Sequence, residues 1–185
     1  MKPRARLKLT LACDKACRYC INHDEAYRKR WVTIDDVSTV DWTRYRTIVV
    51  SGGEPTLDMN LRSTLRSLRI LAGDRPTIYL QTNGANLTKQ LVMDPEVNHS
   101  IDGIGLSVHD YDEFRHLLPR WLDIAKVKPI RLYVSSEMVS ELDLILRVRG
   151  IPTDLFQRRV WSDGVTDQSE DVYLMQNWEK NVRPT

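Results

Sequence analysis

The 185-residue sequence has little cysteine, no long apolar run and almost no net charge. Its three cysteines are an odd number and follow no secretory signal, which argues against a disulfide framework and predicts a reducing, cytoplasmic location. No apolar run approaches the length of a membrane-spanning helix. A formal net charge of +2 gives no reason to expect a nucleic-acid or membrane partner.

What the chain does contain is the composition of an ordinary soluble globule, with 42% hydrophobic and 28% charged residues. Its length predicts a single domain that is large enough for a real core. We expect that core over about residues 4–161, followed by a polar C-terminal extension over residues 162–185.

All three cysteines lie within eight positions, Cys13-Asp-Lys-Ala-Cys17-Arg-Tyr-Cys20. Three thiolates on one loop can converge on one metal centre, and soft thiolates select iron–sulfur clusters, zinc or copper(I). An iron–sulfur cube usually takes four thiolates, so here one iron would be left for a ligand other than cysteine. In catalytic metal sites such an open position is where the substrate binds.

Two other interpretations of this segment stay open on these residues alone. A structural zinc site could combine the three cysteines with His23, because Cys20-Ile-Asn-His23 keeps a spacing typical of zinc ligands. A redox-active thiol pair is the other, although such a pair usually begins a helix and needs no third cysteine. A lipoprotein signal before Cys13 is excluded because Lys8 interrupts an apolar run that is far too short.

Alternating apolar and polar residues predict strands with one apolar face. In the first of them Leu7 and Leu9 share one face. Arg6 and Lys8 share the opposite face. The sequence predicts six strands, at about residues 4–11, 46–50, 77–82, 101–109, 130–135 and 154–161. It predicts helices at about residues 57–72, 86–93, 111–126 and 137–148, with a kink or break in the third near Pro119.

Strands that alternate with helices in this way indicate parallel β/α units. A flat, doubly wound sheet would bury both strand faces and give near-continuous apolar runs, which these strands lack. We therefore expect an α/β fold, an open partial (β/α)6 barrel with helices outside and a polar inner face. Six units are fewer than the eight of a closed barrel. The carboxyl ends of the first four strands, where such folds carry their sites, hold the cysteines, Gly-Gly-Glu-Pro, Thr-Asn-Gly and Ser-Val-His.

With these motifs the sequence resembles the radical S-adenosylmethionine (SAM) superfamily. The resemblance rests on Cys13-x3-Cys17-x2-Cys20 with Tyr19 before the last cysteine, and on the Gly-Gly-Glu-Pro motif of residues 52–55. It implies that the three cysteines bind three irons of a [4Fe–4S] cluster. The fourth iron would chelate the amino and carboxylate groups of SAM.

The resemblance also implies residues that surround SAM. Backbone carbonyls of the Gly-Gly-Glu-Pro motif and the Glu54 side chain would bind its methionine amino group, and Tyr19 would lie near its adenine. The expected cofactor-binding residues are Tyr19, Gly52, Gly53, Glu54, Pro55, Asn83, Ser107, His109 and, through its backbone, Val160. His109 could equally be a hydrogen-bonding structural histidine.

The implied reaction is reductive cleavage of SAM to methionine and a 5′-deoxyadenosyl radical, which abstracts hydrogen from a substrate. The cofactors carry this chemistry and the protein positions them. An external electron donor such as flavodoxin is expected. With only three cysteines, neither an auxiliary cluster nor a spare thiol is available, which argues against sulfur insertion and thiol-quenched epimerisation.

Several substrate classes stay open. A small polar molecule of the pterin or deazapurine type is favoured, by similarity to the compact carboxy-deazaguanine synthases. Its candidate contacts are Arg131, Tyr133, Gln157 and Arg159, which could equally line a solvated lumen. The alternatives are a glycyl-radical-enzyme activase that acts on a protein partner, a peptide-modifying enzyme, and a non-enzymatic zinc or iron–sulfur binding module.

Overall fold

A computed structural model describes the protein at residues 2–17, 20–161, 170–176 and 178–182. Its strands are β1 (Lys2–Lys8), β2 (Trp31–Ile34), β3 (Tyr45–Ser51), β4 (Thr77–Thr82), β5 (Gly103–Ser107), β6 (Ile130–Ser135), β7 (Gln157–Trp161) and β8 (Glu170–Met175). Its α-helices are α1 (Glu25–Arg28), α2 (Leu61–Ala72), α3 (Lys89–Met93), α4 (Pro95–Ser100), α5 (Tyr111–Ala125) and α6 (Val139–Val148). The 3-10 helices η1 (Ile21–His23) and η4 (Pro55–Leu57) follow the cysteines and β3 respectively.

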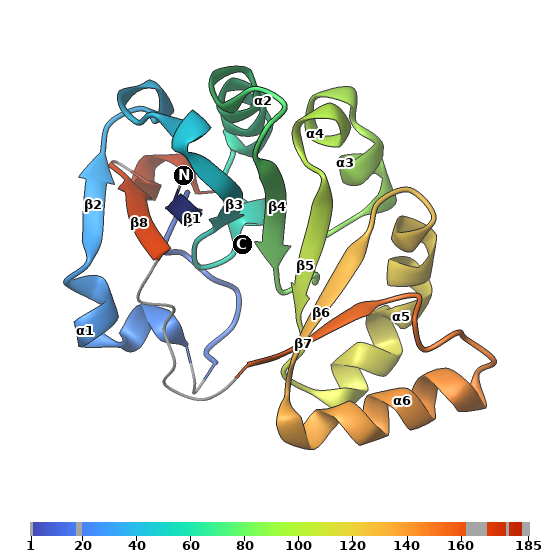
Figure 1. The fold of residues 1–185 in the computed structure, drawn as a ribbon. Coiled ribbons are helices and arrows are strands. Elements are labelled where there is room, and N and C mark those ends of the chain that lie inside the picture. The colour runs from blue at the N-terminus through green and yellow to red at the C-terminus, as the bar shows by residue number, and fades with distance from the viewer. Residues whose placement is uncertain (1, 18–19, 162–169, 177, 183–185) are drawn as a thin grey trace.

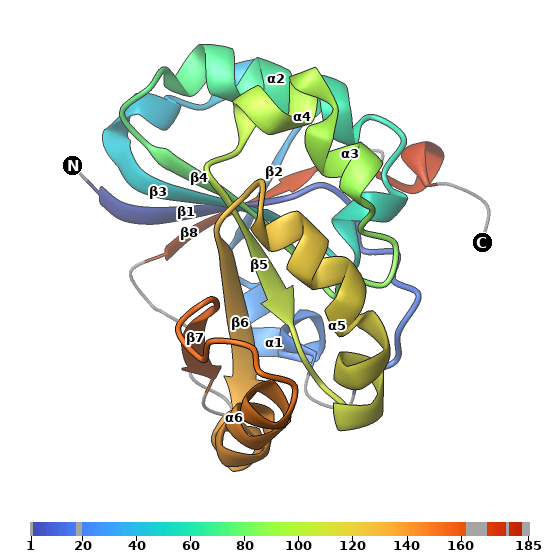
Figure 2. The same cartoon turned by 90° about the vertical axis from the view of Figure 1, so that its right-hand side faces the viewer.

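The strands form one parallel sheet in the order β2-β8-β1-β3-β4-β5-β6-β7. The sheet is curved and open, with β2 and β7 as its two edges. Helices α2, α3, α4 and α5 lie along its convex side (Figures 1 and 2). The expected α/β fold with an open, parallel, barrel-like sheet is confirmed. No helix in the described ranges is long and apolar enough to cross a membrane.

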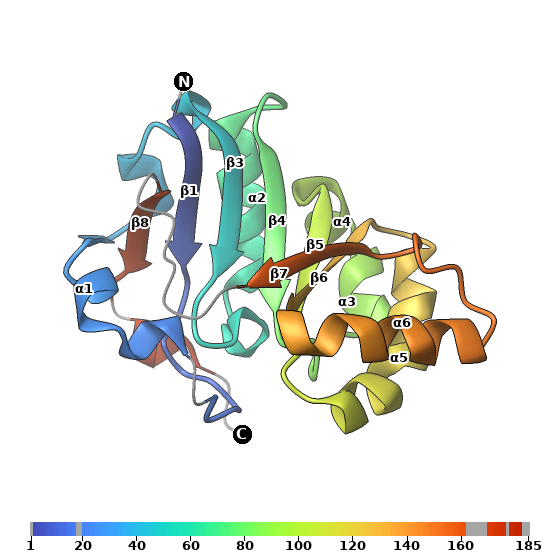
Figure 3. The same ribbon diagram turned by 60° about the horizontal axis from the view of Figure 1, so that its bottom comes forward.

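The sheet has two strands more than the six expected from the sequence. β2 lies between the first two expected strands, where no strand was expected (Figure 1), and β8 lies in the expected C-terminal extension (Figure 3). Neither strand alternates cleanly, because the middle of β2 is exposed on both faces and β8 buries two successive residues. Their stability comes from pairing with distant parts of the chain, since β8 inserts between β1 and β2.

Two expectations about helices were also wrong. The segment after β4 forms two short helices rather than one, with Asp94 capping the second through hydrogen bonds from the Glu96 and Val97 amides. Helix α5 runs through Pro119 without a break, so the expected break is wrong, while a kink there stays a prediction. Proline removes one backbone donor there, and the buried Leu118 and Trp121 hold the helix on the core around that point.

The core lies between the convex face of the sheet and the helices. Apolar strand residues alternate strictly in β4 and β6, where Ile78, Leu80 and Leu132 are fully buried. Helix α2 supplies a matching stripe that includes Leu65 and Leu68. Burying one such side chain stabilises the fold by about 1.5–3 kcal/mol. The concave face is left to polar and small residues, as the alternation predicted.

Candidate functional site at the carboxyl ends of the strands

The loop that follows β1 and the Gly-Gly-Glu-Pro loop (residues 52–55) lie side by side. The Gly53 amide donates to the Thr10 carbonyl at 2.7 Å, and the Glu54 amide donates to the Ala12 carbonyl at 2.8 Å. The backbone pairing of β1 with β3 therefore continues beyond the ends of both strands. This pairing places the start of the cysteine segment (residues 13–20) directly against the second motif.

Neither glycine of that loop has room for a side chain. A Cβ atom at Gly52 would lie 2.3 Å from the Thr10 carbonyl oxygen, and one at Gly53 would lie 2.2 Å from the Ala12 carbonyl oxygen. Both obstacles are backbone atoms, so a side chain could be accommodated only by moving the two loops apart. From the sequence, these glycines were expected to let a ligand come close to the backbone. The structure shows that they also let the loop after β1 pack directly against them.

Glu54 is completely buried and its carboxylate joins two loops. Oε1 accepts hydrogen bonds from the Thr56 amide at 3.0 Å, the Thr56 hydroxyl at 2.6 Å and the Thr82 hydroxyl at 2.6 Å. Oε2 accepts one from the Asn83 amide at 2.8 Å. Burial raises the pKa of Glu54, while these donors oppose the shift. A role of this carboxylate in binding the amino group of SAM stays a prediction.

The end of β4 also holds the cysteine segment in place. The Asn83 amide group donates to Asp14 Oδ1 at 2.6 Å, and that of Asn86 donates to Asp14 Oδ2 at 2.7 Å. Lys15 forms an ion pair with Glu113 of α5. Asn83 was expected to contact SAM. In this structure its side chain binds Asp14, the residue that directly follows the first cysteine, and its contact with SAM stays a prediction.

The three thiols are free, with Cys13 exposed and the other two half-buried. Burial raises the pKa of Cys13 to about 11 and raises the pKa of Cys17, and the thiols oppose one another's ionisation. Because cluster binding needs thiolates, it would release protons from this segment. Within the described residues no three Cys, His, Asp or Glu side chains are placed to hold a metal ion.

The donor set fits an iron–sulfur cluster, since it consists of soft thiols on one short segment beside the second motif. His23, the extra ligand of the zinc interpretation, is exposed at the end of η1. Tyr19 lies outside the described residues.

The other expected cofactor contacts lie around the same end of the sheet and range from buried to exposed. Pro55 is buried at the start of η4. The Ser107 hydroxyl accepts a 3.4 Å hydrogen bond from the amide group of Gln81. His109 is half-buried, and its pKa is lowered by burial and by the nearby Lys15. The side chain of Val160 is 57% exposed. Contacts of these residues with SAM stay predictions.

The structure brings the candidate substrate contacts together on the concave face. The Arg131 guanidinium stacks 3.9 Å above the centre of the Tyr79 ring and donates to the Gln157 side chain at 2.9 Å. Strand register places Tyr133 beside Arg159. Gly105 leaves space for the Tyr133 ring, since a Cβ atom there would lie 2.9 Å from that ring.

Sequence reasoning missed two residues that connect the motifs. Lys8 is only 1% exposed, donates to Asn22 Oδ1, and lies over the rings of Tyr27 and Trp31 at 5.1 and 4.6 Å from their centres. The Asn22 amide group donates to the Gly52 carbonyl at 3.0 Å. Strand alternation placed Lys8 on the polar face, but it gave no sign of its distant partner.

The electrostatic setting of Lys8 is unusual. Burial and the nearby Arg6 together lower the pKa of Lys8 to about 7, although Cys20 and Glu170 act in the opposite direction. Arg6 itself is held by Glu170 at 3.1 Å and by the Gln81 side chain at 2.9 Å. The concave face near β1 thus holds two basic groups beside one carboxylate.

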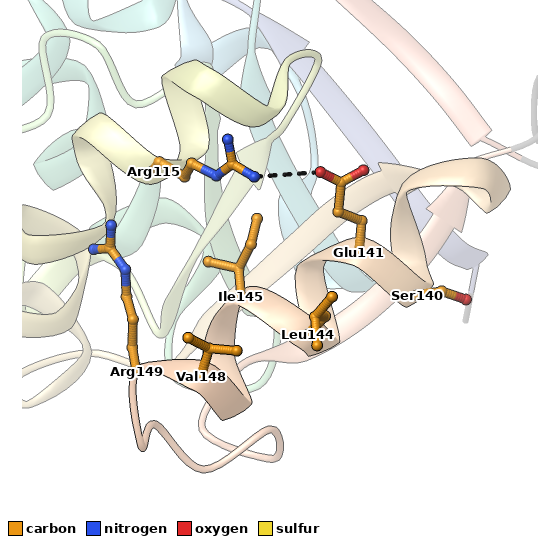
Figure 4. Close-up of a pocket in the computed structure, with 7 residues that line it drawn as sticks. All are labelled: Arg115, Ser140, Glu141, Leu144, Ile145, Val148 and Arg149. Carbon is orange, nitrogen blue, oxygen red and sulfur yellow. Dashed lines mark hydrogen bonds and ion pairs between the residues drawn. The ribbon is translucent and has the colours of Figure 1, made fainter.

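A surface hollow of about 580 Å³ lies elsewhere, between α5 and α6 (Figure 4). Arg115 and Glu141 form a 3.4 Å ion pair on one side of it, and Leu144 and Val148 are exposed. Its lining consists of Arg115, Ser140, Glu141, Leu144, Ile145, Val148 and Arg149. None of the expected site residues contributes to it.

Comparison with known proteins identifies the family. The model of the radical SAM superfamily matches residues 7–161. The chain belongs to the radical SAM superfamily. Members of this superfamily are enzymes that use a [4Fe–4S] cluster and SAM. The match includes the cysteine segment and the Gly-Gly-Glu-Pro loop, and it confirms the family expected from these motifs.

Among characterised proteins the chain is similar to enzymes named GTP 3′,8-cyclase. It is 27% identical to that of Chlorobaculum tepidum over 157 residues, which cover 80% of this chain and 46% of the relative. It is 28% identical to that of Rhodopseudomonas palustris over 130 residues, which cover 66% of this chain and 38% of the relative. The chain therefore spans less than half the length of these relatives.

Among solved structures, that of BtrN in complex with AdoMet and 2-DOIA is similar. The two chains are 20% identical, with a TM-score of 0.46, over 65% of this chain and 52% of BtrN.

Proposed function

We propose that this protein is a radical SAM enzyme whose substrate is a small, polar, anionic molecule. When bound, a reduced cluster would supply one electron to SAM, whose carbon–sulfur bond would break to give methionine and a 5′-deoxyadenosyl radical for hydrogen abstraction from the substrate. The observation that carries the proposal is the direct backbone pairing of the loop before the cysteines with the Gly-Gly-Glu-Pro loop, at the carboxyl ends of β1 and β3.

The chain's own residues would bind and orient the cofactors. Cys13, Cys17 and Cys20 would hold three irons, and carbonyls of residues 52–54 would accept hydrogen bonds from the methionine amino group of SAM. The buried Glu54 fixes the shape of that loop through its bonds to Thr82 and Asn83. An external donor of the flavodoxin type would deliver the electron, in the reducing cytoplasm that free thiols require.

The charge of the concave face supports an anionic substrate. Its inward positions carry Arg4, Arg6, Arg131 and Arg159, with Glu170 of β8 beside Arg4 and Arg6. Guanidinium groups bind phosphate and carboxylate groups through paired hydrogen bonds. The names of the relatives make a purine nucleotide the first candidate, and this agrees with the pterin or deazapurine class favoured by the sequence.

The test is anaerobic reconstitution with iron and sulfide, followed by dithionite and SAM, with and without GTP. Chromatography would measure 5′-deoxyadenosine. We expect an anionic purine to accelerate its formation, and Arg131→Met to reduce that acceleration about tenfold or more, because a charged hydrogen bond is worth about 1.5–3 kcal/mol. Arg115→Met, on the outer surface, is the matched control and should behave as the unmodified protein.

The possible failures separate two claims. If no 5′-deoxyadenosine forms, the proposed chemistry is wrong. If it forms and Arg131→Met responds to the substrate as the unmodified protein does, the substrate does not bind at this end of the concave face. If a peptide or a glycyl-radical protein accelerates cleavage and the purines do not, the substrate is a macromolecule.

A further inference from the structure

We propose that Lys8 and Asn22 are positioning residues that fix the direction of the Gly52 carbonyl, and so prepare the chain to bind SAM. The proposal rests on the proposed function, in which that carbonyl accepts a hydrogen bond from the methionine amino group.

The peptide unit between Gly52 and Gly53 is held at both of its ends. Its N–H, from Gly53, donates to the Thr10 carbonyl at 2.7 Å. Its C=O, from Gly52, accepts from the Asn22 amide group at 3.0 Å. Because a peptide unit is planar, fixing both groups fixes the direction of the carbonyl. A carbonyl oxygen has two lone pairs, so one is left to accept a hydrogen bond from a bound ammonium group.

Lys8 determines which way the Asn22 amide points. In its protonated form the Lys8 amino group has donors only, and in this structure it donates to the carbonyl oxygen of Asn22, Oδ1. The amide nitrogen, Nδ2, is then directed at the Gly52 carbonyl. A reversed amide would place donor against donor at Lys8 and acceptor against acceptor at Gly52. The two observed bonds therefore support a single orientation.

This connection reaches the second motif from the cysteine segment itself. Asn22 follows Cys20 by two residues and lies within η1. The His23 amide donates to the Cys20 carbonyl at 2.9 Å, which holds the start of η1 to the last cysteine. The Asn22 side chain thus links the position of the cysteine segment to the direction of the Gly52 carbonyl.

Lys8 is suited to this role because Asn22 and two aromatic rings hold its amino group in place. Its amino group lies over the faces of the Tyr27 and Trp31 rings. These two rings are T-shaped to each other, with their centres 6.0 Å apart. Taking an amino group out of water costs free energy, which here is offset by the hydrogen bond to Asn22 and by the contacts with the two rings. Such a cost is expected for a group that is retained for binding rather than for stability.

Asn22→Asp is the sharpest variant. It keeps an oxygen for Lys8 and replaces the donor to Gly52 with a second oxygen, which repels the carbonyl. In the cluster-free protein we expect hydrogen exchange of the Gly53 amide to be at least tenfold faster than in the unmodified protein. Asn60→Asp is the matched control, because Asn60 is exposed at the start of α2 and its side chain makes no capping bond. It should leave that exchange rate unchanged.

Lys8→Met separates positioning from stability. Methionine fills a similar volume without a buried amine, so the variant should be at least as stable as the unmodified protein in urea. After reconstitution it should nevertheless bind SAM at least tenfold more weakly, with the same iron content. Lys29→Met, which removes an exposed lysine paired with Glu25, is the control and should bind SAM normally.

The outcomes distinguish this inference from the proposed function. Faster exchange at Gly53 in Asn22→Asp, together with weaker SAM binding by both variants, supports the inference. Unchanged exchange in Asn22→Asp, or unchanged SAM affinity in both variants, overturns it. If the unmodified protein binds no SAM at all, the proposed function fails and this role of Lys8 and Asn22 fails with it. The exchange rates would then report only how the two loops pack.

Discussion

The Glu54 carboxylate accepts a 2.8 Å hydrogen bond from the Asn83 backbone amide, although the two residues come from different β/α units. The motif residue therefore has a structural task that can be measured without any cofactor. Through this bond Glu54 holds together the loops that follow β3 and β4.

Glu54→Gln should destabilise the cluster-free protein. One carboxylate oxygen becomes an NH2 group, which cannot accept a hydrogen bond from the Asn83 amide or the neighbouring hydroxyl groups. An unpaired buried donor costs about 1–3 kcal/mol, and we expect a loss of that size in the free energy of unfolding measured in urea. Glu25→Gln, at an 83% exposed side chain, should have no measurable effect. Equal stability of Glu54→Gln and the unmodified protein would contradict this structural role.

Lys8 should give the cluster-free protein a stability that rises with pH. Its folded pKa of about 7 lies below the usual 10.5, so between these values the unfolded chain binds more protons than the folded one. The contribution of Lys8 is fully present above the unfolded pKa and is lost as the pH falls towards 7. Unfolding in urea at pH 7 and pH 9.5 should show a gain of roughly 3 kcal/mol in the unmodified protein relative to Lys8→Met, because each pH unit between the two pKa values is worth about 1.4 kcal/mol.

Three ionisable groups near Lys8 act on its pKa. Arg6 lowers the pKa of Lys8, whereas Cys20 and Glu170 raise it, and all three residues are present in both proteins. Identical profiles would show that the Lys8 amine keeps its ordinary pKa.

Gly53→Ala should separate the two loops of the site. Its Cβ would lie 2.2 Å from the Ala12 carbonyl oxygen, and relieving that overlap in a packed region costs about 1–3 kcal/mol. Gly150→Ala is the control, because Gly150 has a φ of +66° but nothing within 4 Å of its Cβ position. We expect Gly53→Ala to lose both stability in urea and SAM binding, and Gly150→Ala to lose stability alone. Normal SAM binding by Gly53→Ala would show that the loops need not touch.

The sequence predicted what depends on local pattern. Strict alternation located β4 and β6 to the residue, and it placed Lys8 and Arg131 on the polar face that proved to be concave. β2 and β8 were missed because they lack clean alternation and are held by strands distant in sequence. The registers and partners of such strands are set by tertiary contacts rather than by propensity.

Within the site, the motifs were found because their spacing is local. The bonds that connect them were not found, because they span long stretches of chain. Asn22 and Gly52 are 30 positions apart, and Asp14 and Asn83 are 69 apart. Each of these polar residues could have been an ordinary surface group, and only the fold shows which partner each one meets.

The most direct test of the account is the Cys17→Ala variant after anaerobic reconstitution with iron and sulfide. Visible absorption and iron content would report the cluster, and chromatography after addition of dithionite and SAM would report 5′-deoxyadenosine. The account predicts a brown unmodified protein that cleaves SAM and a Cys17→Ala variant that does neither, with Lys29→Met behaving as the unmodified protein. A colourless protein that binds zinc and leaves SAM intact would contradict it.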